Sequence, residues 1–190
     1  MDVKKPFGEK AKVNRTEEIY RGKLFSFVAE DITLPNGERT EMAMVRHPGS
    51  TGIVPLFDDG AIAMISQYRH PVGDYLLEIP AGTMEPGESA LNCARRELEE
   101  EVGLVAREFI ELAQVHIIPA YSDEKIHLYL ARGLTASKQN LDQDEIIHVV
   151  NPGQWLRYHS SFYHEVRISP WEPSSPLRPV VEHKTLSNRL

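Results

Sequence analysis

Three glutamates, Glu97, Glu100 and Glu101, stand at positions i, i+3 and i+4 of one short stretch. On a helix this spacing places all three carboxylates on one face. Apolar residues recur in the same stretch every three or four positions and form the opposite, core-facing side: Leu91, Ala94, Leu98 and Val102. Two carboxylates about 4 Å apart repel by roughly 4 kcal/mol at an effective dielectric of about 20. Such a cluster against a core therefore requires protonation, basic neighbours or a bound cation.

Basic neighbours are few around these glutamates. Between Gly82 and Leu104, only Arg95 and Arg96 stand against six acidic residues. Oxygen ligands without cysteine or histidine suit hard divalent cations, and Mg²⁺ prefers a few carboxylates together with water and substrate phosphate. The cluster therefore indicates chemistry on a phosphate ester or pyrophosphate. The alternative is a solvated, charged helix face.

The glutamates need a helix, and the sequence predicts one over 90–102, with Ser89 as its N-cap and Gly103 at its end. A β-hairpin is expected over 24–34 and 40–46, because a Pro-Asn-Gly turn sequence joins the two runs. Further extended runs predict strands at 53–57, 61–68, 75–79, 108–118, 125–131 and 146–150. These elements together predict an α/β (α+β) fold.

The segment from Gly82 to Leu104 resembles the Nudix box. That box is a glycine, five residues, a glutamate, seven residues and then Arg-Glu-aliphatic-any-Glu-Glu-any-Gly-aliphatic, and every defined position matches. Nine constrained positions match by chance on the order of 10⁻⁹ per starting point, so the resemblance is specific. It implies an α/β/α sandwich with a mixed central sheet, here preceded by the N-terminal antiparallel hairpin. It also implies hydrolysis of nucleoside diphosphates linked to another group.

Carried over position by position, the resemblance implies a site for Mg²⁺, with Mn²⁺ as the alternative. The bound cation neutralises the pyrophosphate, orients it and lowers the pKa of an attacking water. Arg96 is expected to pair with the helix carboxylates and with Glu88 and to hold them in place. The implied metal ligands are three glutamates and one backbone carbonyl: Glu97, Glu100, Glu101 and Ala81.

Outside the box, Gln67-Tyr68-Arg69 and the run from Leu77 to Gly82 resemble the branch of ADP-ribose pyrophosphatases and nucleoside diphosphate sugar hydrolases. The branch implies hydrolysis of ADP-ribose or a related nucleoside diphosphate sugar to a nucleoside monophosphate and a sugar phosphate. It also implies a homodimer that exchanges N-terminal strands. Two departures, Ala120 in place of a glycine and Tyr121, leave dinucleoside polyphosphates open as alternative substrates. A non-catalytic nucleotide sensor is the further alternative.

In this branch the catalytic base is a glutamate on a loop after the box. The matching loop spans 141–146, where Glu145 is the predicted base and Asp142 and Asp144 are the alternatives. A base on a loop suits a site that closes to exclude bulk water. Arg69 is expected to contact a phosphate or to stack on the base of the nucleotide. The predicted catalytic set is Glu145, Glu100 and Arg96, and the predicted substrate-binding set is Arg69, Met84 and Glu88.

Composition limits the partners and the location. With 28 acidic and 21 basic residues in 190, the chain has a formal net charge of −7, which argues against binding to nucleic acid or to a membrane surface. One cysteine, no secretory signal and no apolar run of about 18 residues favour a cytoplasmic protein. The sequence divides into a flexible arm over 1–14, a hydrolase domain over 15–150 that includes the hairpin, and an atypical tail over 151–190.

Overall fold

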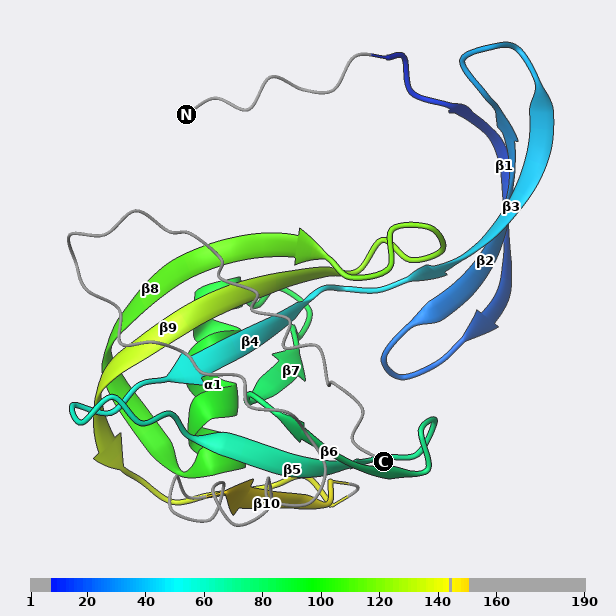
Figure 1. The fold of residues 1–190 in the computed structure, drawn as a ribbon. Coiled ribbons are helices and arrows are strands. Elements are labelled where there is room, and N and C mark those ends of the chain that lie inside the picture. The colour runs from blue at the N-terminus through cyan, green and yellow to red at the C-terminus, as the bar shows by residue number, and fades with distance from the viewer. Residues whose placement is uncertain (1–7, 144, 151–190) are drawn as a thin grey trace, which may run out of the picture.

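The computed structural model describes residues 8–143 and 145–150 of the 190-residue chain. This part of the chain forms three β-sheets and one helix. Two sheets and the helix make up the body of the molecule, and the N-terminal sheet projects from it (Figure 1). No helix among these residues is long and apolar enough to cross a membrane.

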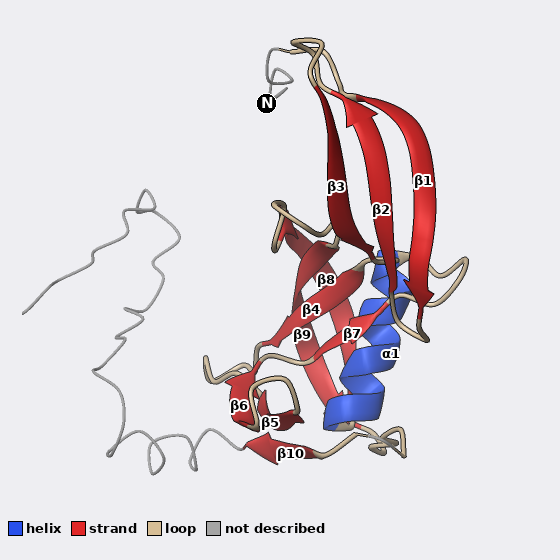
Figure 2. Ribbon diagram, turned by 90° about the vertical axis from the view of Figure 1, so that its right-hand side faces the viewer, coloured by secondary structure: helices blue, strands red, loops and turns tan. Residues whose placement is uncertain are grey.

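The projecting sheet contains β1 (Lys12–Arg21), β2 (Ser26–Thr33) and β3 (Arg39–Arg46), which are antiparallel in that order. Figure 2 shows these strands extending away from the body as a curved ribbon. The predicted hairpin is confirmed as β2 and β3. β1 is not predicted from the sequence, because its apolar residues do not alternate with polar ones and the whole strand is exposed. It begins at Lys12, so the last residues of the arm expected over 1–14 are strand.

The central sheet of the body has the strand order β7-β4-β9-β8. β4 and β9 are parallel and the other neighbours antiparallel, which confirms the predicted mixed sheet. Its strands are β4 (Ser50–Pro55), β7 (Ala81–Thr83), β8 (Leu104–His116) and β9 (Lys125–Ala136). A second, antiparallel sheet of order β10-β5-β6 contains β5 (Met64–Arg69), β6 (Asp74–Glu78) and β10 (Ile147–Val150).

The helix α1 (Ala90–Val102) has the predicted bounds and packs on the central sheet (Figure 2). Ser89 Oγ accepts a hydrogen bond from the backbone N–H of Asn92 at 3.2 Å, and Gly103 ends the helix with φ +67°. The inner face of α1 joins a core in which Ile53, Ile65 and Leu98 are fully buried. Burial of each such side chain contributes about 1.5–3 kcal/mol, so core packing fixes which face of α1 carries the glutamates.

The structure differs from the sequence prediction in two elements of the body. β7 is too short to produce a recognisable apolar alternation, and β8 begins at Leu104, directly after the helix, rather than at residue 108. In the residues that the structure describes, α1 is the single helix, so the second helical layer of the expected α/β/α sandwich is not found there. The predicted tail over 151–190 lies outside the described residues.

Candidate functional site

The helix glutamates face the short strand β7, and Gly82 makes this approach possible. Gly82 pairs with Thr51 of β4, and a Cβ atom at residue 82 would overlap the Glu97 carboxylate. Any side chain larger than hydrogen would therefore force Glu97 away from the strand. The glycine that opens the box is thus required by close packing between β7 and α1.

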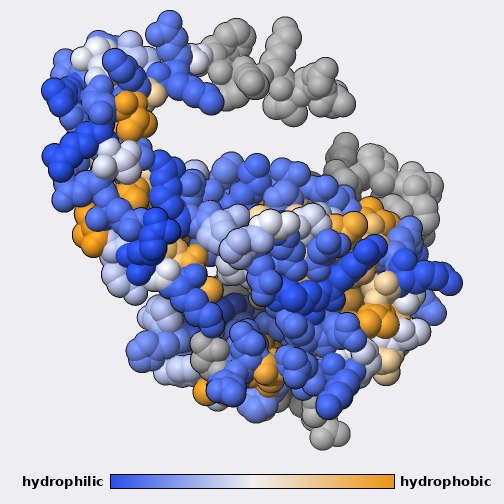
Figure 3. All heavy atoms as spheres, turned by 180° about the vertical axis from the view of Figure 1, so that it is seen from behind, coloured by the Kyte–Doolittle hydropathy of each residue, from blue (hydrophilic) through white to orange (hydrophobic). Residues whose placement is uncertain are grey.

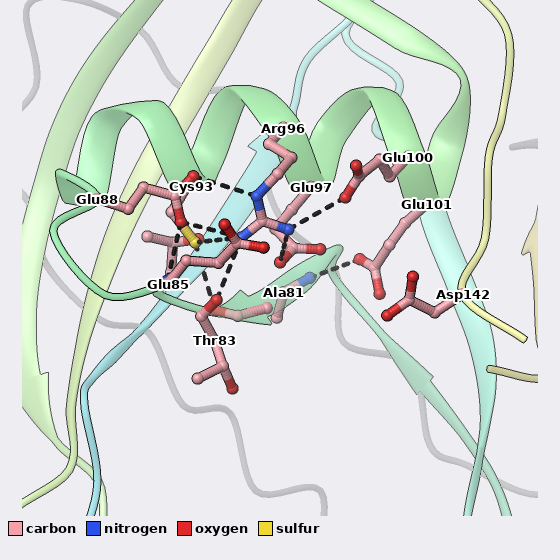
Figure 4. A network of polar contacts seen from close by, with 12 residues as sticks. Ala81, Thr83, Glu85, Glu88, Cys93, Arg96, Glu97, Glu100, Glu101 and Asp142 are labelled. Atoms are coloured by element: carbon pink, nitrogen blue, oxygen red, sulfur yellow. Dashed lines mark hydrogen bonds and ion pairs between the residues drawn. The ribbon is translucent and has the colours of Figure 1, made fainter. Parts of the chain in front are cut away.

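Arg96 links Glu88, in the segment between β7 and α1, to Glu97 and Glu100 on the helix (Figure 4). Its Nη1 donates to Glu97 Oε1 at 2.7 Å and to Glu100 Oε2 at 3.0 Å. Its Nε and Nη2 donate to the two oxygens of Glu88 at 3.1 and 3.0 Å, and Nη2 also donates to the carbonyl of Thr83 at 3.2 Å. The expected pairing of Arg96 with Glu88 and the helix glutamates is therefore present. The hydrogen bonds from Arg96 lower the pKa of Glu88.

Glu101 is the most buried member of the cluster, with 1% of its surface exposed. Its Oε2 accepts a hydrogen bond from the backbone N–H of Ala81 at 2.8 Å, whereas its buried Oε1 has no hydrogen-bond partner. Burial raises the pKa of Glu101 to about 8, and the charges of Glu97 and Glu145 act in the same direction. Burial also raises the pKa of Glu97 to about 7 against the opposing effect of Arg96. Both carboxyl groups thus lack the solvation that stabilises their charged forms.

These residues fit a hard divalent cation. The donors are oxygens, and the buried Oε1 of Glu101 is an acceptor without a partner. The hydrogen bond from Ala81 to Glu101 places the predicted backbone ligand beside the same carboxylate. Within the described residues, no three acidic, cysteine or histidine side chains converge closely enough to hold a cation by themselves. Arg96 Nη1 occupies the space between Glu97 and Glu100 by donating to both.

The loop before β10 brings Glu145 into electrostatic range of the cluster. Its charge helps to raise the pKa values of Glu97 and Glu101, although burial is the largest cause and closer partners have larger effects. Glu145 Oε2 accepts a hydrogen bond from the backbone N–H of Asp142 at 3.2 Å. Asp142 itself is exposed and is drawn on the Glu101 side of the network (Figure 4). The third candidate base, Asp144, lies outside the described residues.

Arg69, at the end of β5, lies within electrostatic range of Glu101 and Glu145. Its Nη2 donates to Glu78 Oε2 at 2.6 Å and its Nε to Glu78 Oε1 at 3.2 Å. The hydrogen bonds to Glu78 are the main reason why its pKa is raised, and the charges of Glu101 and Glu145 add to the effect. The partnership with Glu78 is not part of the sequence prediction, although Glu78 belongs to the Leu77–Gly82 run that resembles the family.

Met84, the remaining predicted substrate-binding residue, packs on the start of β4. Its backbone N–H donates to the carbonyl of Gly49 at 3.0 Å, and a Cβ atom on Gly49 would collide with the Met84 methyl group. Its side chain is half-buried. The structure therefore gives Met84 a packing contact, whereas Arg96 and Arg69 hydrogen-bond to carboxylates.

Comparisons with known proteins agree with this geometry. The NUDIX domain family model matches residues 46–173, so all of the projecting sheet except its last residue, Arg46, precedes the matched region. An ADP-ribose pyrophosphatase of Bacillus subtilis is 38% identical over 136 residues, which cover 70% of this chain and 74% of that protein. A methanol dehydrogenase activator of Bacillus methanolicus is 38% identical over 142 residues, covering 73% of this chain and 76% of that protein.

More distant relatives extend the same pattern. The ADP compounds hydrolase NudE of Escherichia coli is 30% identical over 139 residues, covering 72% of this chain and 74% of that protein. A crystal structure of an ADP compounds hydrolase superposes with a TM-score of 0.65 at 28% identity, covering 75% of this chain and 77% of that chain. The predicted family and fold class are thereby confirmed, and this chain belongs to the Nudix hydrolase family.

Proposed function

We propose that the protein hydrolyses the pyrophosphate bond of ADP-ribose or a related nucleoside diphosphate sugar, with Mg²⁺ or Mn²⁺ as cofactor. The products are a nucleoside monophosphate and a sugar phosphate. The observation that carries the proposal is the buried carboxylate of Glu101, which has an unpartnered oxygen beside Glu97 and the Ala81 backbone. The names of the relatives, an ADP-ribose pyrophosphatase and ADP compounds hydrolases, support the choice of substrate.

The cation would be held by oxygen atoms on α1 and β7: the carboxylates of Glu97, Glu100 and Glu101 and the carbonyl of Ala81. When bound, it supplies positive charge that neutralises the diphosphate and makes an attacking water more acidic. Arg96 keeps Glu97, Glu100 and Glu88 in position through its hydrogen bonds. Without that arginine, the carboxylates would repel one another out of the ligand geometry.

Arg69 and Glu145 complete the proposed machinery. Arg69 carries a guanidinium within electrostatic range of Glu101, and a guanidinium binds a phosphate group through paired hydrogen bonds. Glu145 takes the proton of the attacking water, because its charge reaches both buried glutamates and it lies on the loop before β10. Asp142, which donates its N–H to Glu145, is the alternative base. Met84 and Glu88 lie in the segment between β7 and α1 and would border the substrate.

The projecting sheet supports the proposal of a homodimer that exchanges its N-terminal strands. Figure 3 shows hydrophobic residues on this sheet, away from the body. The large apolar side chains exposed on it and its turns are Val13, Ile19, Tyr20, Leu24, Phe25 and Met42. A second copy would bury this surface, and sedimentation equilibrium at micromolar concentration measures whether the protein is a dimer. The cytoplasmic location remains a prediction of the sequence.

A panel of substrates tests the proposed activity. With Mg²⁺ present, we expect AMP and ribose 5-phosphate from ADP-ribose, faster than the products from GDP-mannose, NADH or diadenosine polyphosphates. Preference for diadenosine polyphosphates would instead support the second candidate, which rests on the exposed Tyr121 in the loop after β8. Binding of ADP-ribose without turnover would indicate a sensor. No turnover of any of these compounds with Mg²⁺ or Mn²⁺ would contradict the proposal.

A further inference from the structure

Two buried side-chain oxygens have no hydrogen-bond partner in the residues that the structure describes: Glu101 Oε1 and Gln67 Oε1. Gln67 lies on β5 and is 7% exposed. A buried amide oxygen without a donor costs about 1–3 kcal/mol, so such a group is rarely left unused. Gln67 stands two residues before Arg69 on β5, yet it is not one of the residues of the proposed catalytic machinery.

The alternation of β5 places Gln67 toward the glutamate cluster. Ile65, Gln67 and Arg69 share one face of the strand because side chains alternate along it. On one side, Ile65 belongs to the same core cluster as Leu98, which lies one turn before Glu101 on α1. On the other side, Arg69 is within electrostatic range of Glu101. Gln67 lies between these two neighbours, and therefore opposite the part of α1 that carries Glu101.

The register of β5 with β6 places the Gln67 amide beside the ion pair between Arg69 and Glu78. Arg69 is opposite Asp74 and Gln67 is opposite Leu76, whereas Ile65 is opposite Glu78. Arg69 and Glu78 therefore lie on either side of the Gln67–Leu76 pair, and their ion pair joins them diagonally across it. The unpartnered oxygen of Gln67 is buried on this face rather than turned to solvent.

We propose that the Gln67 amide oxygen accepts a hydrogen bond from a water molecule bound to the cation at Glu101. Both unpartnered atoms are acceptors, and a hydrated divalent cation supplies what each one lacks: positive charge for a carboxylate and water O–H donors for an amide oxygen. A neutral amide provides this acceptor without adding another negative charge to the cluster. Gln67 is then a positioning residue for the metal site. The inference rests on the proposed function, since it needs a cation at Glu101.

Mn²⁺ binding without substrate tests the inference, with free Mn²⁺ counted by electron paramagnetic resonance. Gln67→Met keeps the length of the side chain and removes the acceptor, and we expect its Mn²⁺ dissociation constant to rise about tenfold. Gln67→Glu keeps an acceptor at the same place and is expected to bind Mn²⁺ at least as tightly as the unaltered protein. Gln114→Met, at an exposed position on β8, is the matched control and should leave binding unchanged.

The outcomes separate this inference from the proposed function. If Gln67→Met binds Mn²⁺ as tightly as the unaltered protein while Glu101→Gln loses binding, the metal site stands and the role of Gln67 is refuted. If neither the unaltered protein nor Glu101→Gln binds Mn²⁺, both proposals fail. Should Gln67→Met not fold, Gln67→Glu decides alone, because weaker Mn²⁺ binding by that variant contradicts an acceptor at residue 67.

Discussion

One ion pair of the projecting sheet and one ion pair of the body differ in how much of each lies in water. In the sheet, Arg39 pairs with Asp31 while 70% of the arginine side chain is exposed. In the body, Arg96 pairs with Glu88 with only 26% and 14% of the two side chains exposed. Water screens the first pair, so it contributes little to stability. Loss of one partner from a buried pair costs about 3–5 kcal/mol, because a buried charge is left alone.

The same contrast appears in the carboxyl pKa values. Hydrogen bonds from Arg39 lower the pKa of Asp31 in the projecting sheet. Burial raises the pKa of Glu97 to about 7 and of Glu101 to about 8 in the body. Arginine partners lower a carboxyl pKa in both regions, as for Asp31 in the sheet and Glu88 in the body. Glu97 and Glu101 differ because their burial outweighs the charges that would stabilise the ionised form. Such burial is the condition that favours a cation ligand.

The largest expected effect is the loss of activity on removal of the Glu101 charge. Glu101→Gln keeps the shape of the side chain and is expected to lower kcat for ADP-ribose at least about a hundredfold, since the cation contributes several kcal/mol to such reactions. Glu99→Gln is the matched control on the same helix, because Glu99 is exposed and bonds Ser137. Comparable turnover by the two variants would show that Glu101 does not bind the catalytic cation.

Arginine replacement measures the contrast between the two regions directly. Arg96→Met leaves Glu88 and Glu97 without their main partner, so the free energy of unfolding should fall by about 2–3 kcal/mol after allowance for the partial exposure of Arg96. Arg39→Met in the projecting sheet should lower the free energy of unfolding much less than Arg96→Met does, because water screens its ion pair. Urea unfolding of the metal-free proteins gives both values. Equal losses would remove the distinction between the regions.

Gly82→Ala should displace the Glu97 carboxylate, because the added Cβ occupies its position. A shift of a catalytic ligand by an ångström can lower the rate a hundredfold, and we expect a loss of about tenfold or more in kcat with ADP-ribose. Gly37→Ala, in the open β2–β3 turn where a Cβ meets no atom within 4 Å, is the control. Its activity should remain unchanged despite a cost of about 1 kcal/mol in stability. Retained activity in Gly82→Ala would mean that Glu97 tolerates displacement.

The last expected effect is a change in the pH dependence of stability. The folded-state pKa of Glu101, about 8, lies above its ordinary value of 4.5, so folding favours the protonated form. Its stabilising contribution is complete below about pH 4.5 and is lost as the pH rises through about 8. In the presence of a chelator, Tm should therefore fall less between pH 5 and pH 8 for Glu101→Gln than for the unaltered protein. Identical slopes would contradict the raised pKa.

The sequence predicts the helix and its chemistry well because both depend on local signals. Ser89, Gly103 and the apolar spacing specify α1, and the box spacing places Arg96 one turn from Glu100. In contrast, β1 is not predicted, because an exposed strand carries no apolar alternation. The expected second helical layer also has no counterpart in the described part of the chain.

The parts of the site that the sequence does not predict depend on tertiary contacts. The ion pair between Arg69 and Glu78 depends on the register of β5 with β6, which sets the two residues on either side of the Gln67–Leu76 pair. The raised pKa of Glu101 depends on β7, a strand of three residues that brings Ala81 to its carboxylate. No periodicity in the sequence encodes these distances, although Gln67, Arg69 and Glu78 all lie in runs that resemble the family.

Hydrolysis of ADP-ribose by the full chain in ¹⁸O-labelled water tests the central claim most directly. The account predicts equal amounts of AMP and ribose 5-phosphate, one ¹⁸O atom in one of the two products, and loss of the reaction when a chelator removes Mg²⁺. Recovery after addition of Mg²⁺ should require an intact Glu101. Absence of these products, or their formation at the same rate in the presence of chelator, would contradict a cation-dependent pyrophosphate hydrolase at the α1 glutamates.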